Sequence, residues 1–150
     1  MHAEKFQALL DVGVVSPGAV LERFDALAAI EPAFMFGAWE GGLVPTGHPG
    51  EQQLAALRWA GKIFRGEDDV DPIVILDDQG RRQVSAVMGK AALRMVRYRG
   101  VSTATMIYDK HPIFDHFRAA GEDLVLGVMD RKGDPAPLCF YLRRLGAAPA

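Results

Sequence analysis

The chain has 150 residues, of which 49% are hydrophobic, and its formal net charge is −2. This length predicts a single domain, residues 1–150, whose core is large enough to need neither a metal nor a disulfide. The slight acidity supplies no overall field that would attract a polyanion, so sequence-independent nucleic-acid binding is not expected, and we interpret the basic residues at 90–99 as a solvated sheet face. No stretch approaches the roughly 18 apolar residues of a membrane-spanning helix, so no membrane span is expected.

The compartment is predicted from the cysteine content and from the start of the chain. Cys139 is the one cysteine, so an internal disulfide is excluded. It lies in the apolar run Leu138-Cys-Phe-Tyr-Leu142, where we expect a buried and unreactive thiol. The first residues lack the pattern of a secretory signal, which favours a cytoplasmic protein.

Residues 1–32 are predicted to be a helical lead-in. Gly13 is placed to end a first short helix, and Ser16 offers an N-cap oxygen to a second helix over residues 17–30. Pro17 then occupies the first helical position, and Pro32 stops the apolar stripe. About thirty residues cannot bury their own apolar face, so these helices are expected to pack against a β core.

From residue 33 the chain changes to short apolar runs separated by turn residues. The pattern predicts strands at 34–43, 62–64, 73–76, 83–88, 92–99, 101–108, 124–130 and 138–145, with one short helix at 51–59. If residues 108–118 form a short helix or an irregular turn with Phe114 and Phe117 facing inward, Asp115 and Arg118 could pair. Short strands without long intervening helices favour an antiparallel barrel or sandwich.

Several runs carry a family resemblance. Gly37-Ala-Trp-Glu-Gly41, followed by Pro45-Thr-Gly-His-Pro49 and Trp59-Ala-Gly-Lys-Ile-Phe64, resembles the bacterial family named for its Gly-x-Trp-x-Gly (GXWXG) motif. Met95–Gly100, Ala104–Asp109, Pro112–Arg118 and Leu126–Asp130 resemble the domain of unknown function DUF4334. The resemblance divides the domain into a GXWXG segment at 33–90 and a DUF4334-like segment at 91–146. It implies no particular activity.

The Gly-x-Trp run is also similar to the first strand of the calycins, which include lipocalins, fatty-acid-binding proteins and haem-carrying nitrobindins. This likeness implies that Trp39 packs near the closed end of a barrel against Arg143 or Arg144. The predicted fold class is therefore mainly β, an antiparallel calycin-like β-barrel preceded by N-terminal helices.

The first functional hypothesis is the binding of a small, largely apolar or lipid-like metabolite, because barrels of about eight strands can enclose one ligand. The residues predicted to contact it are Trp39, His48, Met95, Met106, Tyr108 and Phe140. Ordinary core packing is the alternative interpretation of each apolar side chain in this set.

The second hypothesis is a small cofactor-free enzyme, either an isomerase, a lyase or a hydrolase. His48 lies in a loop, where an imidazole can act as acid or base near neutral pH. It would have to converge with Asp109, Asp115 or His116 around the same cavity. Asp115 and His116 are neighbours that point in opposite directions, so they cannot form the dyad by themselves.

No metal site is predicted, because no histidine or cysteine pair has the spacing of a zinc site. Haem held through His48 or His111 is left open by the likeness to nitrobindins. A third possibility is an accessory module that binds a partner protein through an exposed apolar patch.

Overall fold

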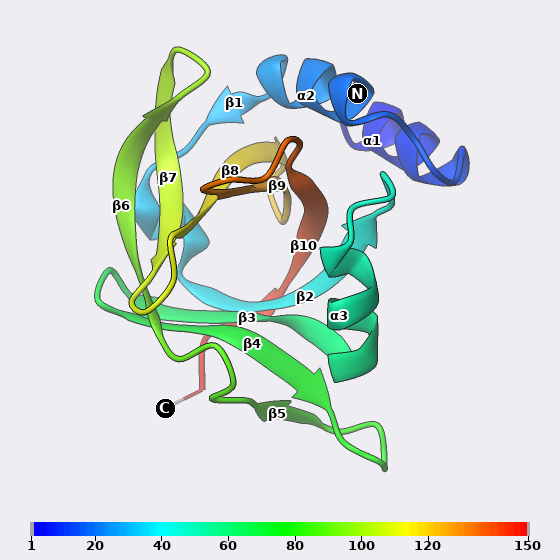
Figure 1. Cartoon of the computed structure of the whole chain (residues 1–150). Helices are drawn as coiled ribbons and strands as arrows, with labels where there is room; N and C mark the ends of the chain where they lie inside the picture. The colour runs from blue at the N-terminus through cyan, green and yellow to red at the C-terminus, as the bar shows by residue number, and fades with distance from the viewer. Residues whose placement is uncertain (1, 150) are drawn as a thin grey trace.

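The structure is a computed structural model that describes residues 2–149 (Figure 1). The helices are α1 (His2–Asp11), α2 (Pro17–Asp25), the short 3-10 helix η1 (Pro32–Met35) and α3 (Gly50–Leu57). The strands are β1 (Ala28–Ala29), β2 (Gly37–Val44), β3 (Trp59–Gly66), β4 (Asp69–Leu76), β5 (Arg82–Val84), β6 (Ala91–Tyr98), β7 (Val101–Tyr108), β8 (Ile113–Gly121), β9 (Leu124–Arg131) and β10 (Leu138–Gly146). None of the helices within residues 2–149 is long and apolar enough to cross a membrane.

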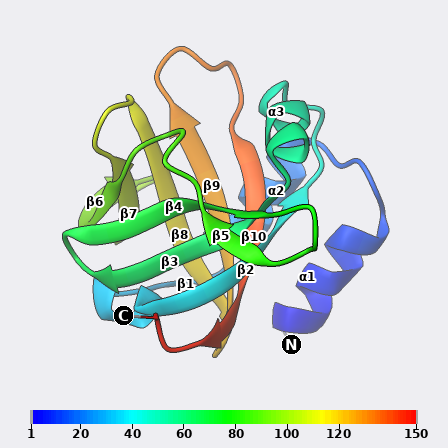
Figure 2. The same cartoon turned by 90° about the horizontal axis from the view of Figure 1, so that it is seen from below.

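Eight antiparallel strands close into a barrel, which confirms the predicted mainly-β fold. The order around the barrel is β10, β2, β3, β4, β6, β7, β8 and β9, and β9 returns to β10. β1 and β5 add to β8 and β4. Figure 1 looks into the barrel and Figure 2 shows it turned by 90°, with α1 and α2 outside it.

The helices α1 and α2 pack on the outer face of the barrel, as their apolar stripes predicted. Their fully buried Phe6 and Phe24 join an outer apolar cluster that also holds Cys139. The prediction of a buried thiol at Cys139 is confirmed. Ser16 Oγ accepts a hydrogen bond from the Ala19 N–H, so the predicted N-cap is also confirmed.

The second helix ends at Asp25, so the prediction that it continues to residue 30 was wrong. Arg118, on the outer face of β8, donates to the carbonyls of Phe24, Asp25 and Leu27. The guanidinium therefore adds a donor to carbonyl groups at and just beyond the helix end. The next residues extend as β1 and pair with β8 instead of continuing the helix.

Residues 113–121 form β8, so the short helix or irregular turn considered for residues 108–118 was wrong for its second half. The Asp115–Arg118 pair was also wrong, because residues three apart in a strand lie on opposite faces. Asp115 points into the barrel toward Lys62, and Arg118 points outward to α2. The predicted helix at 51–59 ends at Leu57, since Arg58 adopts a left-handed conformation and Trp59 begins β3.

One end of the barrel is filled around Trp39, the central residue of the GXWXG motif. Trp39 is fully buried, and its Nε1 donates to the Met35 carbonyl at 2.8 Å. The Arg144 guanidinium lies 4.3 Å from the indole centre and donates to the carbonyls of Phe34 and Phe36. This confirms the predicted packing of Trp39 against an arginine of the last strand. The other end of the barrel is less completely filled.

Candidate functional site

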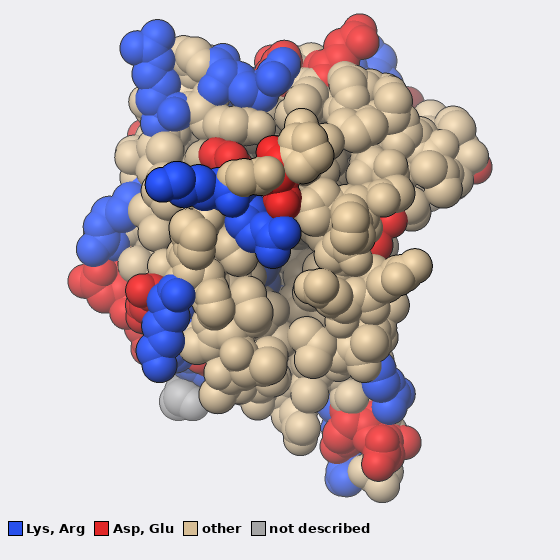
Figure 3. Space-filling view, viewed as in Figure 1, with Lys and Arg blue, Asp and Glu red and all other residues tan. Residues whose placement is uncertain are grey.

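A cavity of about 130 Å³ opens at the end of the barrel that α3 covers. Its walls come from α3, the loop before it, and strands β3, β4, β7, β8, β9 and β10. An engineered apolar cavity of about 150 Å³ holds one benzene molecule, so this space suits a group the size of a six-membered ring. In the space-filling view the mouth is a hollow bordered mainly by uncharged residues, with charged side chains along one edge (Figure 3).

The rim of the cavity is held together by His48. Its Nδ1 accepts a hydrogen bond from the Gly50 N–H at 2.9 Å, and its Nε2 lies 2.8 Å from Asp134 Oδ2. Nε2 is therefore the protonated nitrogen of the neutral ring. Arg131 donates to the other oxygen of Asp134 at 2.8 Å. These bonds tie the loop before α3 to the turn between β9 and β10 across the mouth.

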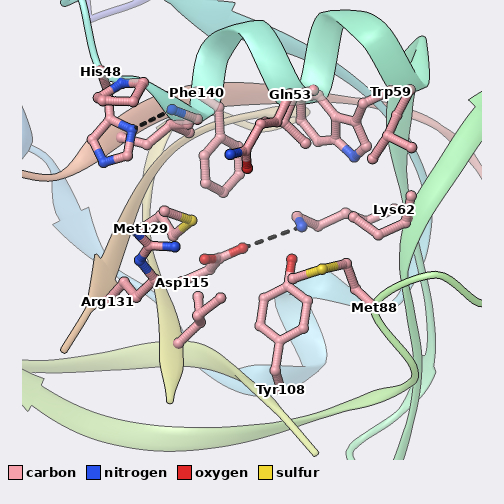
Figure 4. A pocket seen from close by; sticks show the side chains of 17 residues that line it. His48, Gln53, Trp59, Lys62, Met88, Tyr108, Asp115, Met129, Arg131 and Phe140 are labelled. Carbon is pink, nitrogen blue, oxygen red and sulfur yellow. Dashed lines mark hydrogen bonds and ion pairs between the residues drawn. The ribbon is translucent and has the colours of Figure 1, made fainter. Parts of the chain in front are cut away.

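The floor of the cavity carries a buried ion pair (Figure 4). Lys62 on β3 and Asp115 on β8 are each 2% exposed, and Lys62 Nζ lies 3.1 Å from Asp115 Oδ2. Nζ also donates to the Pro72 carbonyl at 3.1 Å. Among residues 2–149, Asp115 Oδ1 has no hydrogen-bond partner. Buried polar atoms are almost always paired, so an orphaned carboxylate oxygen in a cavity wall indicates a place for a ligand donor.

Burial moves both groups of the pair toward their neutral forms. Removal from water raises the pKa of Asp115, and the charge and hydrogen bond of Lys62 oppose that rise. Removal from water lowers the pKa of Lys62, and the charge and hydrogen bond of Asp115 oppose that fall. Burial also raises the pKa of Tyr108 well above its usual value, with a contribution from the Asp115 charge. The Tyr108 hydroxyl therefore stays protonated at neutral pH.

Three aromatic rings surround the Lys62 ammonium. Its Nζ lies 5.5 Å from the Trp59 ring, 5.7 Å from Tyr108 and 5.3 Å from Phe140. These distances are within the range of cation–π attraction, which favours a cation at this depth. In Figure 4 the Tyr108 hydroxyl points toward the Lys62–Asp115 pair.

Two glycines shape the cavity by leaving room for its aromatic walls. A Cβ at Gly41, the last residue of the GXWXG motif, would lie 2.4 Å from the Trp59 ring. A Cβ at Gly127 would lie 2.4 Å from the Phe140 ring. Both rings line the cavity, so the two glycines allow them to lie back against the barrel wall.

The structure brings four of the sequence-predicted site residues to this cavity. His48, Tyr108, Asp115 and Phe140 line it. Trp39, Met95 and Met106 do not line it. Trp39 and Met106 are fully buried in the filled part of the core, and Met95 is 42% exposed on the part of β6 that runs toward its turn with β7.

His116 and Asp109 also lie away from the cavity. Because successive side chains of β8 alternate, Asp115 points inward and His116 outward. The His116 ring stacks on Tyr98 with 3.9 Å between centroids, and its nitrogens lie 2.9 Å from Thr105 Oγ1 and 3.3 Å from Asp130 Oδ2. The predicted acid–base roles of His48 and the three partners proposed for it stay predictions.

Sequence reasoning missed Lys62, although its position contained a signal. Lys62 lies two residues before Phe64 on β3, so the two side chains share one face of the strand. Lys62 also pairs across the sheet with Trp39. Both of these neighbours point into the core, so strand alternation places Lys62 inside as well. A lysine in such a place is buried only when a partner neutralises it, and that partner is distant in sequence.

The residues around the cavity do not fit a haem. A space suited to one six-membered ring is far too small for a porphyrin, both ring nitrogens of His48 already have partners, and His111 does not line the cavity. Within residues 2–149 no group of three histidine, cysteine or carboxylate side chains is placed to hold a metal ion.

Comparison with known proteins relates both halves of the chain to described families. Residues 22–80 match the family described as GXWXG protein, and residues 89–144 match the domain of unknown function DUF4334. The crystal structure of a protein from Thermomonospora curvata is similar, with 38% sequence identity, a TM-score of 0.87, and coverage of 96% of this chain and 99% of that one. No curated protein matches the chain. The resemblances to the GXWXG family and to DUF4334 are thus confirmed, and the chain belongs to the family of GXWXG proteins with a DUF4334 domain.

Proposed function

We propose that the protein binds a small, largely apolar molecule in the barrel cavity, with the polar group of that molecule at the Lys62–Asp115 pair. The observation that carries the proposal is a buried charged pair with one unsatisfied oxygen at the floor of a ring-sized, mostly apolar space. Ligand pockets in proteins combine apolar walls of this kind with a few polar groups that fix the orientation of the ligand.

The walls favour a hydrocarbon ring. They include the side chains of Leu54, Ile73, Met129, Leu138 and Phe140, which offer dispersion contacts and no hydrogen bonds. Each square ångström of apolar ligand surface removed from water contributes about 25 cal/mol. The cavity holds the ring itself, and any longer substituent would leave through the mouth beside α3.

The floor favours a hydroxyl or carbonyl group on that ring. An unsatisfied buried acceptor costs about 1–3 kcal/mol, which a ligand hydroxyl would recover by donating to Asp115 Oδ1. Lys62 Nζ is a donor that a ligand oxygen can reach from the same side. A ligand carrying a net charge would instead add a third charge to a site from which water is excluded.

Titration of the protein with cyclohexanol, cyclohexanone and cyclohexane tests the proposal through tryptophan fluorescence. Trp59 lines the cavity and Trp39 does not, so a saturable change should appear in the wild type and disappear in Trp59→Phe, which keeps Trp39 as an internal control. Cyclohexane should bind more weakly than the two oxygenated rings, because it can form no hydrogen bond with Lys62 or Asp115. Absence of saturable binding by all three rings would contradict the proposal.

A further inference from the structure

We propose that the cavity catalyses proton transfer at the carbon next to a ketone, with Asp115 as the base and Lys62 as the group that holds the carbonyl oxygen. The substrate class is a small cyclic or otherwise compact β,γ-unsaturated ketone, which the protein converts into its conjugated isomer. This inference rests on the proposed binding function and adds a reaction to it.

The two oxygens of Asp115 have different surroundings, and this difference places the base. Oδ2 lies 3.1 Å from Lys62 Nζ, while Oδ1 is buried and has no partner among residues 2–149. Asp115 lines the cavity, and we place proton acceptance at Oδ1 because no group of the described residues engages its lone pairs. Asp115 is only 2% exposed, so its carboxylate has little contact with bulk water. Burial raises the pKa of this carboxyl, which makes it a stronger base than an exposed aspartate.

Lys62 is placed to hold the negative charge that forms on the carbonyl oxygen. An ammonium has three N–H donors. Within the described part of the chain, two of them are directed to Asp115 Oδ2 and to the Pro72 carbonyl. The third remains for a ligand oxygen in the cavity that Lys62 lines. The Tyr108 hydroxyl, which points toward the same pair, offers a second donor beside it (Figure 4).

The reaction consists of two proton transfers and needs no further reactant. Asp115 Oδ1 takes a proton from the carbon between the carbonyl and the double bond, so that C–H bond breaks. Its electron pair forms a new C=C bond, and the carbonyl π electrons move to the oxygen beside the Lys62 ammonium. The same proton then returns from Asp115 to the far end of the original double bond. The new C–H bond regenerates the carboxylate and leaves the conjugated ketone.

The apolar walls help both steps. Because the walls exclude water, the fixed donors Lys62 and Tyr108 stabilise the negative charge of the dienolate more strongly than they would in water. Preorganised donors in such a site typically contribute about 10²–10³-fold in rate. A base positioned for the proton typically contributes about 10²–10⁴-fold. The walls also keep the carbon that gains the proton close to the carboxyl that carries it.

The test is the isomerisation of cyclohex-3-enone to cyclohex-2-enone, followed by the ultraviolet absorbance of the conjugated product. Asp115→Asn keeps the shape of the side chain and removes the base, so the rate should fall by about 10²-fold or more. Lys62→Met keeps the length of the chain and removes the cation, with a loss of similar size. The surface variants Asp78→Asn and Lys132→Met lie outside the cavity and should react at the wild-type rate.

A variant that fails to fold would not test the mechanism, so the double variant Lys62→Met/Asp115→Asn is included. It carries neither member of the buried pair, and circular dichroism shows whether it folds. It should bind the ketone without converting it.

Binding of cyclohex-3-enone is measured in parallel through the fluorescence of Trp59. Saturable binding with conversion at the rate of buffer alone would overturn the proposed reaction and leave the binding function standing. Conversion by Asp115→Asn or by the double variant at the wild-type rate would also overturn the reaction. Failure of cyclohex-3-enone to bind would overturn the reaction, and failure of the three saturated rings as well would overturn the binding function.

Discussion

The Lys62–Asp115 pair predicts a marked asymmetry between single and double substitutions. At 3.1 Å and an effective dielectric constant near 20, two unit charges attract by about 5 kcal/mol. Each partner offsets the cost of burying the other. Asp115→Asn or Lys62→Met alone should therefore lower the free energy of unfolding by about 3–5 kcal/mol, because a charge is left buried without its partner.

The double variant should be far more stable than the sum of the two losses implies. Replacement of a buried ion pair by neutral side chains of similar size is often neutral or stabilising. We expect Lys62→Met/Asp115→Asn to lie within about 2 kcal/mol of the wild type, with a large coupling energy in the cycle. Urea unfolding followed by circular dichroism measures all four proteins.

The pH dependence of the two single variants should run in opposite directions. Burial lowers the pKa of Lys62, so in Asp115→Asn the unfolded chain binds more protons than the folded one between the lowered pKa and the normal value of 10.5. The stability of Asp115→Asn should therefore rise as pH increases through that window. Burial raises the pKa of Asp115, so the stability of Lys62→Met should rise as pH falls through the raised pKa toward 3.8.

Two results would refute this reasoning. Single variants that each cost less than about 1 kcal/mol would show that the charges are not desolvated together. Costs that simply add in the double variant would show that the two side chains are not coupled.

Three further predictions concern the motif, an outer histidine and the cysteine. Gly41→Ala should push the Trp59 ring into the cavity and weaken the binding of ring ligands in the fluorescence titration. The control Gly66→Ala, which has no atom within 4 Å of its new Cβ, should bind like the wild type. Equal affinities of the two variants would contradict the role of Gly41. Burial lowers the pKa of His116 despite the opposing Asp130 charge, so stability in urea should fall as pH drops below about 6.5 toward that lowered pKa, and His116→Gln should lessen this fall. Burial raises the pKa of Cys139 to about 12, so its thiol should react with a disulfide reagent near pH 8 only as fast as the protein unfolds, and rapid labelling of the folded protein would refute this.

Local patterns in the sequence were enough to predict much of the fold. The Ser16-Pro17 start of α2, the strands predicted at 101–108 and 138–145, and the burial of Cys139 each depend on neighbours within a few residues. The packing of an arginine on Trp39 was implied by the likeness of the first barrel strand to calycins, and Arg144 occupies that position. Asp115 was among the predicted site residues, although the pair it was expected to form with Arg118 was wrong.

The composition of the site was decided only by the closure of the barrel. Alternation places Lys62 and Asp115 on inward faces, but only the tertiary arrangement brings the facing strands β3 and β8 to within 3.1 Å at these side chains. The same holds for Gly41 and Trp59, whose close approach depends on how β2 lies against the start of β3. The sequence by itself therefore determined most of the strands and much of the apolar core, but neither β8 nor the burial of Lys62. The tertiary structure alone decided which buried groups meet, because strand register and barrel closure depend on contacts between segments far apart in the chain.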